Sequence, residues 1–392
     1  MSQAEPRQER GTIHLDVALQ GGGAHGAFTW GVLDRLLLEE HIRFDGISGT
    51  SAGAVNAAAL AAGLNSGGCE EARAGLRRVW ETVGRLGSWL AEPGVALTSG
   101  TPLEPWARAA QAWQRAWLAT LGPVSSWPQQ AALVWNAAWS AAVSPYESNP
   151  WDLNPLRYIL AETIDFDAVR NCTQLQLFIA ATEVRTGRLR LFGCHETTID
   201  VVLASGCLPT LFQAVHIDGQ PYWDGGYAGN PALLPLVAKT VADDVLIVQI
   251  NPAQRPREPR TATEILDRMN EIVFNATLLK DLRTLALMRR LLQTAGPAPT
   301  PVAPGSDAHG LRRLADSADG LARVANLRLH CIDGGNDLGE LSPATKAAVT
   351  LSSVTQLHDL GWEHAQTWLA RHRDDLGARA TLDLDRYLDI TL

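Results

Sequence analysis

Cysteine is scarce in this chain of 392 residues, which contains only five. No two of them form a CxxC or CxxH pair, and their number is odd. Such a set predicts neither a disulfide framework nor a zinc site, so we expect buried thiols in a reducing compartment. We also expect no metal ion and no other cofactor. The five residues are Cys69, Cys172, Cys194, Cys207 and Cys331.

A run of basic residues is missing as well. Lysine and arginine total 33 against 42 aspartates and glutamates, which gives a formal net charge of −9. Nucleic acid is disfavoured as a partner, because its binding requires a basic patch. The same charge balance argues against electrostatic docking on anionic lipid.

The chain has no apolar stretch long enough to cross a bilayer. In its middle region the longest, residues 131–143, is interrupted by Asn136 and Ser140. Residues 1–12 are polar and contain no apolar signal-peptide core, so we expect them to form a disordered tail. These features predict a cytoplasmic protein without a transmembrane segment. They leave open a peripheral contact with a membrane, lipid or polymer surface.

Glycine-rich turns organise the region from Val17 to Leu64, which contains two successive strand–turn–helix units. In the first unit, the apolar run Ile13–Leu19 precedes a helix, and the turn between them is Gly21-Gly22-Gly23-Ala24-His25-Gly26. In the second, Phe44–Ser48 precedes an alanine-rich helix, and the turn is Gly49-Thr50-Ser51-Ala52-Gly53. The repeated order predicts a parallel sheet. Turns of this kind lie at its carboxyl edge, where α/β proteins place their sites.

The second turn fits the pattern of a nucleophile elbow. Glycines at 49 and 53 flank Ser51, as a turn too tight for neighbouring Cβ atoms requires. Alone, such a pentapeptide more often marks a plain strand-to-helix turn. The strand before it and the helix after it favour Ser51 as a nucleophile.

The first turn has two interpretations. It satisfies G-x-G-x-x-G with Asp45 about twenty residues on, which is the pattern of a dinucleotide site and suggests a nucleotide-binding regulatory protein. However, Asp45 leads directly into the second glycine turn, where a ribose-binding acid should end a strand. We therefore favour an oxyanion hole. It would use backbone amides of Gly21, Gly22 and Gly23, together with the N–H of Ala52 after the nucleophile.

Asp224-Gly225-Gly226 follows a hairpin predicted around Asp218-Gly219. Alone, the tripeptide reads as an ordinary Asp-Gly turn. Beside a nucleophile elbow and an oxyanion loop, it predicts a catalytic carboxylate.

These motifs together resemble the patatin-like phospholipases. The resemblance rests on GGGAHG with GTSAG, followed by ASGCLP at residues 204–209 and WDGG at residues 223–226. It implies a three-layer αβα fold with a mainly parallel central sheet and a Ser–Asp dyad. In that dyad Ser51 is the nucleophile and Asp224 the proton acceptor. His25 stands where the family usually carries Arg or Lys, so a fixed charge is replaced by one that titrates.

Tryptophan is concentrated between Trp89 and Trp151, where eight of the thirteen lie. Their helical spacing predicts a helical hairpin inserted at about residues 86–150, which either packs on the body or forms a lid-like wall for acyl chains. Residues 294–310 are rich in proline, glycine and alanine and predict a mobile loop. We expect one catalytic domain over residues 13–335 and a helical extension over residues 336–392.

The sequence therefore predicts a serine acyl hydrolase that cleaves lipid or other carboxylic esters. An intracellular polyester or storage-polymer depolymerase would use the same dyad. A Ser–Asp–His hydrolase stays open too, with His330 the first histidine to test. The sequence does not decide between a monomer and a homo-oligomer.

Overall fold

The computed structural model describes residues 11–91, 144–255, 257–294, 323–340 and 349–388. Its centre is an eight-stranded sheet in the order β5-β6-β3-β2-β1-β7-β8, with β4 paired to β3. Strands β3, β2, β1, β7 and β8 run parallel, whereas β4, β5 and β6 are antiparallel additions. The strands are β1 (Ile13–Leu19), β2 (Ile42–Thr50), β3 (Gln176–Glu183), β4 (Leu189–Phe192), β5 (Val215–Ile217), β6 (Gln220–Asp224), β7 (Asp244–Gln249) and β8 (Arg328–Asp333).

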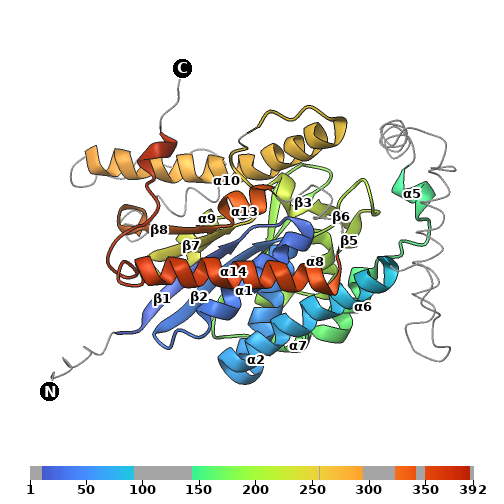
Figure 1. Ribbon diagram of the computed structural model, residues 1–392, viewed down its shortest axis with the longest axis horizontal. Coiled ribbons are helices and arrows are strands. Elements are labelled where there is room, and N and C mark those ends of the chain that lie inside the picture. The colour runs from blue at the N-terminus through green and yellow to red at the C-terminus, as the bar shows by residue number, and fades with distance from the viewer. Residues whose placement is uncertain (1–10, 92–143, 256, 295–322, 341–348, 389–392) are drawn as a thin grey trace.

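Helices cover both faces of the sheet, so the predicted three-layer αβα class is confirmed. In Figure 1, β7 and β8 lie between α10 on one side and α14 on the other. The α-helices are α1 (Gly26–Leu36), α2 (Ala52–Ala91), α5 (Pro145–Ser148), α6 (Pro155–Thr163), α7 (Phe166–Arg170), α8 (Ile199–Ser205), α9 (Leu234–Lys239), α10 (Ala262–Thr294), α13 (Gly335–Glu340) and α14 (Leu351–His372). The 3₁₀ turns are η1 (Gly23–His25), η3 (Cys194–Glu196), η4 (Gly225–Tyr227) and η6 (Asp385–Tyr387).

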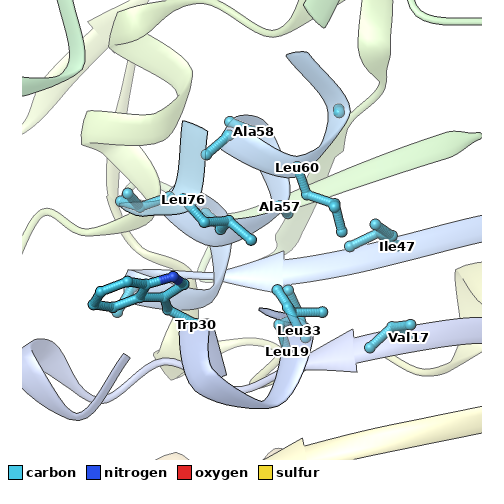
Figure 2. Packing of buried hydrophobic residues seen from close by; sticks show 14 of the residues in the cluster. Val17, Leu19, Trp30, Leu33, Ile47, Ala57, Ala58, Leu60 and Leu76 are labelled. Carbon is cyan, nitrogen blue, oxygen red and sulfur yellow. The ribbon is translucent and has the colours of Figure 1, made fainter. Parts of the chain in front are cut away.

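The larger hydrophobic core lies between the sheet and the layer of α1, α2 and α14. Its centre joins β1 and β2 to α1 and α2, and Figure 2 shows Val17, Leu33, Ile47 and Leu60 directed into this region. A second core packs α9 and α10 against the other face, with Phe178 and Ile247 among its sheet residues. The apolar run at β1 faces both layers, as expected for a central parallel strand.

Helices α1 and α14 cross at two glycines. A Cβ on Gly31 would come within 1.9 Å of the His358 carbonyl oxygen, and one on Gly361 within 2.0 Å of the Phe28 carbonyl oxygen. Only glycine permits so close an approach of two helices. Helix α14, which lies in the expected C-terminal extension, therefore packs within the same core as the sheet.

The sequence misplaced some boundaries. Strand β2 begins at Ile42 rather than Phe44, because Ile42 pairs with Ile13 of β1. The alanine-rich helix continues past Leu64 as α2, with a kink where Gly67 and Gly68 have non-helical backbone angles. Most of the Trp-rich segment, the 295–310 stretch and residues 1–10 lie outside the described ranges. Within those ranges, none of the helices combines the length and apolar character that crossing a membrane requires.

Candidate active site

Ser51 lies between the end of β2 and the start of α2. Its φ is 54°, a left-handed backbone conformation that residues other than glycine rarely adopt. A Cβ on Gly49 would come within 2.5 Å of the Gly53 carbonyl oxygen. One on Gly53 would come within 2.3 Å of the Leu19 carbonyl oxygen. The two glycines therefore allow the sharp turn, and the local backbone has the form of a nucleophile elbow.

The end of α8 supports Ser51 from one side. The Ser51 N–H donates a hydrogen bond to Ser205 Oγ at 2.9 Å. Gly206 is the next residue, and a Cβ built on it would lie 3.7 Å from Ser51 Oγ. The stretch at 204–209 that carries part of the family resemblance is thus a wall of the site. Sequence reasoning gave Ser205 no role.

Asp224 ends β6, the strand that pairs with β3 through Ala181 opposite Asp224. Its side chain is buried, with 2% of the residue exposed. The carboxylate accepts a hydrogen bond from the Gly226 N–H at 2.7 Å, and the Ser51 side chain lies within hydrogen-bonding reach of it. Burial raises the pKa of Asp224 to about 7, and these two partners offset only part of that rise.

The glycines after Asp224 are required by packing. A Cβ on Gly225 would come within 2.2 Å of the Ala180 carbonyl oxygen, and one on Gly226 within 2.2 Å of the Phe274 ring. Asp224-Gly225-Gly226 is therefore a tightly enclosed segment and not a solvent-exposed turn.

The first glycine turn lies directly against the elbow. A Cβ on Gly21 would come within 2.6 Å of both Ser51 Cβ and the Thr50 carbonyl oxygen. Gly23 has φ of 61°, and Gly26 packs so closely on Ala52 that a Cβ there would meet the Ala52 Cβ at 2.6 Å. The structure thus brings the predicted loop, Ser51 and Asp224 into one place at the carboxyl edge of the sheet.

Four buried amide side chains hold this loop. Asn230 Oδ1 accepts the Gly21 N–H at 2.7 Å, and Asn251 Nδ2 donates to the Gly21 carbonyl at 2.6 Å. Gln20 Oε1 accepts the Asn251 N–H at 2.8 Å, while Gln20 Nε2 donates to Asn275 Oδ1 at 2.8 Å. Because the Gly21 N–H is engaged, it is not a free donor for a ligand. Sequence reasoning missed all four, although Gln20 and Asn251 each directly follow an apolar strand run.

Ala24 and His25 belong to η1, and Gly26 begins α1. His25 and Ala24 are buried, His25 with 2% of its surface exposed. The Gly26 carbonyl accepts a hydrogen bond from Asn56 Nδ2 at 2.9 Å, which ties this turn to α2. His25 is therefore enclosed in the protein and does not present a side chain to solvent.

Other candidates from the sequence have structural partners. His330 Nε2 lies 3.0 Å from Asp244 Oδ1, and its Nδ1 lies 3.0 Å from Thr381 Oγ1. Asp244 begins β7, at the sheet end opposite the elbow, so His330 is remote from Ser51. Asp45 accepts the backbone N–H groups of Val241 and Ala242, at 2.6 and 3.1 Å. In the described part of the chain, no cluster of three or more His, Cys, Asp or Glu side chains is arranged to hold a metal.

Comparison with known proteins gives one family. The family model for patatin-like phospholipase matches residues 17–237. A search of curated proteins finds no match. Among solved structures, VipD from Legionella pneumophila is similar at 15% identity over 91% of this chain and 67% of that chain, with a TM-score of 0.32. ExoU of Pseudomonas aeruginosa, crystallised with SpcU, is similar at 16% identity over 81% and 70%, with a TM-score of 0.24. Both structures share a low sequence identity and a low TM-score with this chain.

Proposed function

The chain belongs to the patatin-like phospholipase family and is a lipid ester hydrolase, and on this premise we propose that it acts through a Ser51–Asp224 dyad. The observation that carries the proposal is that the two side chains lie within hydrogen-bonding reach at the carboxyl edge of the sheet. A nucleophile and a base within hydrogen-bond reach are the minimum for covalent acyl transfer.

In the proposed reaction, Ser51 Oγ attacks the ester carbonyl while Asp224 accepts the hydroxyl proton. The alcohol leaves with that proton, and an acyl-enzyme remains on Ser51. Water, deprotonated by Asp224, then releases the carboxylic acid. An aspartate with an ordinary pKa near 3.9 is a weak base for a hydroxyl. A pKa of about 7 brings Asp224 close to the optimum for general base catalysis at neutral pH.

We assign the oxyanion donors to the backbone N–H groups of Gly22, Gly23 and Ala52. Ala52 begins α2, and the first N–H groups of a helix have no acceptor within it. Gly23 begins η1, two residues after Gly21, whose Cβ position would meet Ser51. Gly21 is not assigned as a donor, because its N–H donates to Asn230. Its lack of a side chain instead leaves room for Ser51. Loss of one oxyanion donor typically costs about 3 kcal/mol of transition-state stabilisation.

The test is covalent labelling followed by a substrate panel. A fluorophosphonate probe should add one adduct per chain, located on Ser51 by peptide mass. The labelled protein should lose activity on a panel that includes a phospholipid, a lysophospholipid, a neutral ester and a polyester. A wild-type protein that hydrolyses esters but carries its adduct elsewhere would overturn the assignment of Ser51. The panel identifies the preferred ester class.

A further inference from the structure

In the first half of α10, acidic side chains face the protein and apolar side chains face outward. The Glu271 side chain is fully buried and that of Asp267 is 13% exposed, and both are paired with Arg255 on the protein side of the helix. The opposite side carries five apolar side chains that are between 43% and 56% exposed. These are Ile265, Leu266, Met269, Ile272 and Val273. A helix of a water-surrounded protein normally has the reverse arrangement.

The second half of α10 continues the same stripe with basic residues. Helical spacing places Lys280, Arg283 and Arg290, all exposed, in line with the apolar residues of the first half. The exposed Leu287 and Leu291 lie between them. Asp281 points inward instead, where its carboxylate accepts the Leu233 N–H at 3.1 Å. We call the ten outward residues, five in each half, the α10 face.

The α10 face differs in charge from the chain as a whole. The chain has a formal net charge of −9, yet the charged residues of this face are all cations. Among the α10 side chains that the structure describes, Glu264 at the start of the helix is the one exposed acid. A stripe of apolar and cationic residues on a long helix is the signature of a helix that lies in the plane of a lipid interface.

This helix also supports the candidate active site. The Phe274 ring packs on Gly226, whose N–H donates to Asp224, and it contacts the Tyr227 ring at a centroid distance of 5.5 Å. A surface bound along the α10 face would lie roughly 10 Å, about one helix diameter, from the turn that carries Asp224. Figure 1 shows α10 along one border of the molecule, where η6 overlaps it in that view.

We propose that the α10 face docks the protein on the surface of a bilayer that contains anionic phospholipid. This inference rests on the proposed function, because docking there would bring lipid esters next to Ser51. The apolar half inserts between headgroups, while Lys280, Arg283 and Arg290 attract anionic headgroups. The remaining acidic surface is repelled by the same bilayer, so docking has one orientation. The net charge of the whole chain disfavours electrostatic docking, whereas this proposal is based on the local charge of the α10 face.

The binding test uses the full-length Ser51→Ala protein, so that no substrate is consumed. Sedimentation with vesicles of phosphatidylcholine alone is compared with sedimentation with vesicles that also contain phosphatidylserine. Binding should require phosphatidylserine and weaken as salt is added. Reversing all three cations (Lys280→Glu, Arg283→Glu, Arg290→Glu) should weaken it by at least about 100-fold, since each basic charge near an anionic surface is worth roughly fivefold. Met269→Ser with Ile272→Ser should also weaken it.

The matched control is Arg77→Glu, a charge reversal at an exposed position of α2, in the helix layer across the sheet. It should bind vesicles as Ser51→Ala does. With Ser51 intact, the triple reversal should hydrolyse a soluble p-nitrophenyl ester at the wild-type rate and lose activity on vesicles. Equal binding to both vesicle types, or no effect of the reversals, would overturn docking. So would self-association in analytical ultracentrifugation that the α10 substitutions abolish. If vesicles bind as described but no ester is cleaved, the proposed function fails and the docking surface stands.

Discussion

The side chains of Ser51 and Asp224 lie within hydrogen-bonding reach of each other, although the two residues are 173 positions apart in sequence. The contact depends on β2 and β6 lying on either side of β3, so that both residues reach one edge of the sheet. Ser51 comes from a parallel strand and Asp224 from an antiparallel one. The predictions below follow from this pair and from the groups that hold it.

Asp224→Asn keeps the size of the side chain but removes the proton acceptor. We expect kcat to fall by about 10²- to 10⁴-fold, the usual contribution of a positioned general base. Replacing His195, His216 or His330 one at a time should leave kcat within about tenfold of wild type. Ester hydrolysis is measured on variants with native circular dichroism. One folded histidine variant that loses three orders of magnitude would restore the Ser–Asp–His mechanism.

The pH dependence of activity should report the raised pKa of Asp224, which is about 7 because burial penalises the charged carboxylate. The base must be ionised, so kcat/KM should fall about tenfold per pH unit below pH 7 and level off above it. The rate of fluorophosphonate labelling of Ser51 should follow the same curve. A profile that is flat from pH 5 to 8 would contradict Asp224 as a base with this pKa.

Ser51 stores backbone strain, since its φ of 54° is unfavourable for any residue with a Cβ. Both Ser51→Ala and Ser51→Gly should abolish hydrolysis. Ser51→Gly should nevertheless be the more stable of the two in urea, by about 1 kcal/mol, because glycine adopts this conformation without steric cost. Because both variants lack the hydroxyl, the difference between their free energies of unfolding does not include its loss. Equal stability would mean that the elbow relaxes when the hydroxyl is removed.

Asn251→Asp should damage catalysis without damaging the fold. The aspartate has the size of asparagine but cannot donate to the Gly21 carbonyl, so the oxyanion loop should lose its position against Ser51. We expect kcat for a short soluble ester to fall by tenfold or more with KM little changed, because the loop acts in the transition state. Asn171→Asp, on an exposed residue after α7, is the control and should have wild-type kinetics. A change confined to KM would argue against a positioning role.

Asp16 should make the protein less stable as the pH rises. It is fully buried in β1 beside Thr240 and Arg323, and burial raises its pKa to about 8. The folded state therefore holds a proton that the unfolded state releases near pH 4, so the free energy of unfolding falls between about pH 4 and 8. Asp16→Asn should match wild type near pH 3, where the carboxyl is protonated in both states, and exceed it at pH 9, on the order of a few kcal/mol, in urea titrations. If the two unfold at the same urea concentration at pH 9, Asp16 is not protonated in the fold.

Local patterns were sufficient for the strands and turns that carry Ser51 and Asp224. Strand β1 was predicted to the residue, since an apolar run bounded by a glycine turn is a signal contained in one segment. The amide network was missed because its members, Gln20, Asn230, Asn251 and Asn275, lie in four segments that only the topology brings together. No sequence motif contains two of these four residues.

The net charge of the chain and the charge of one helix face are different quantities. Net charge is a sum, so it cannot reveal that the cations on the outer side of α10 are separated from the acids that face inward. Apolar residues recur along both sides of this helix. The acidic side of the first half of α10 faces the protein, where Glu271 pairs with Arg255.

The crossing of α1 and α14 has a consequence for biosynthesis. The backbones at Gly31 and Gly361 pack against each other, so α1 has no partner on that side until residues 351–372 have left the ribosome. Helix α1 begins directly after the glycine turn that lies against Ser51. A nascent chain that already carries both Ser51 and Asp224 therefore still lacks the helix that seats this turn. The order of translation therefore places completion of the fold around this turn after the synthesis of α14.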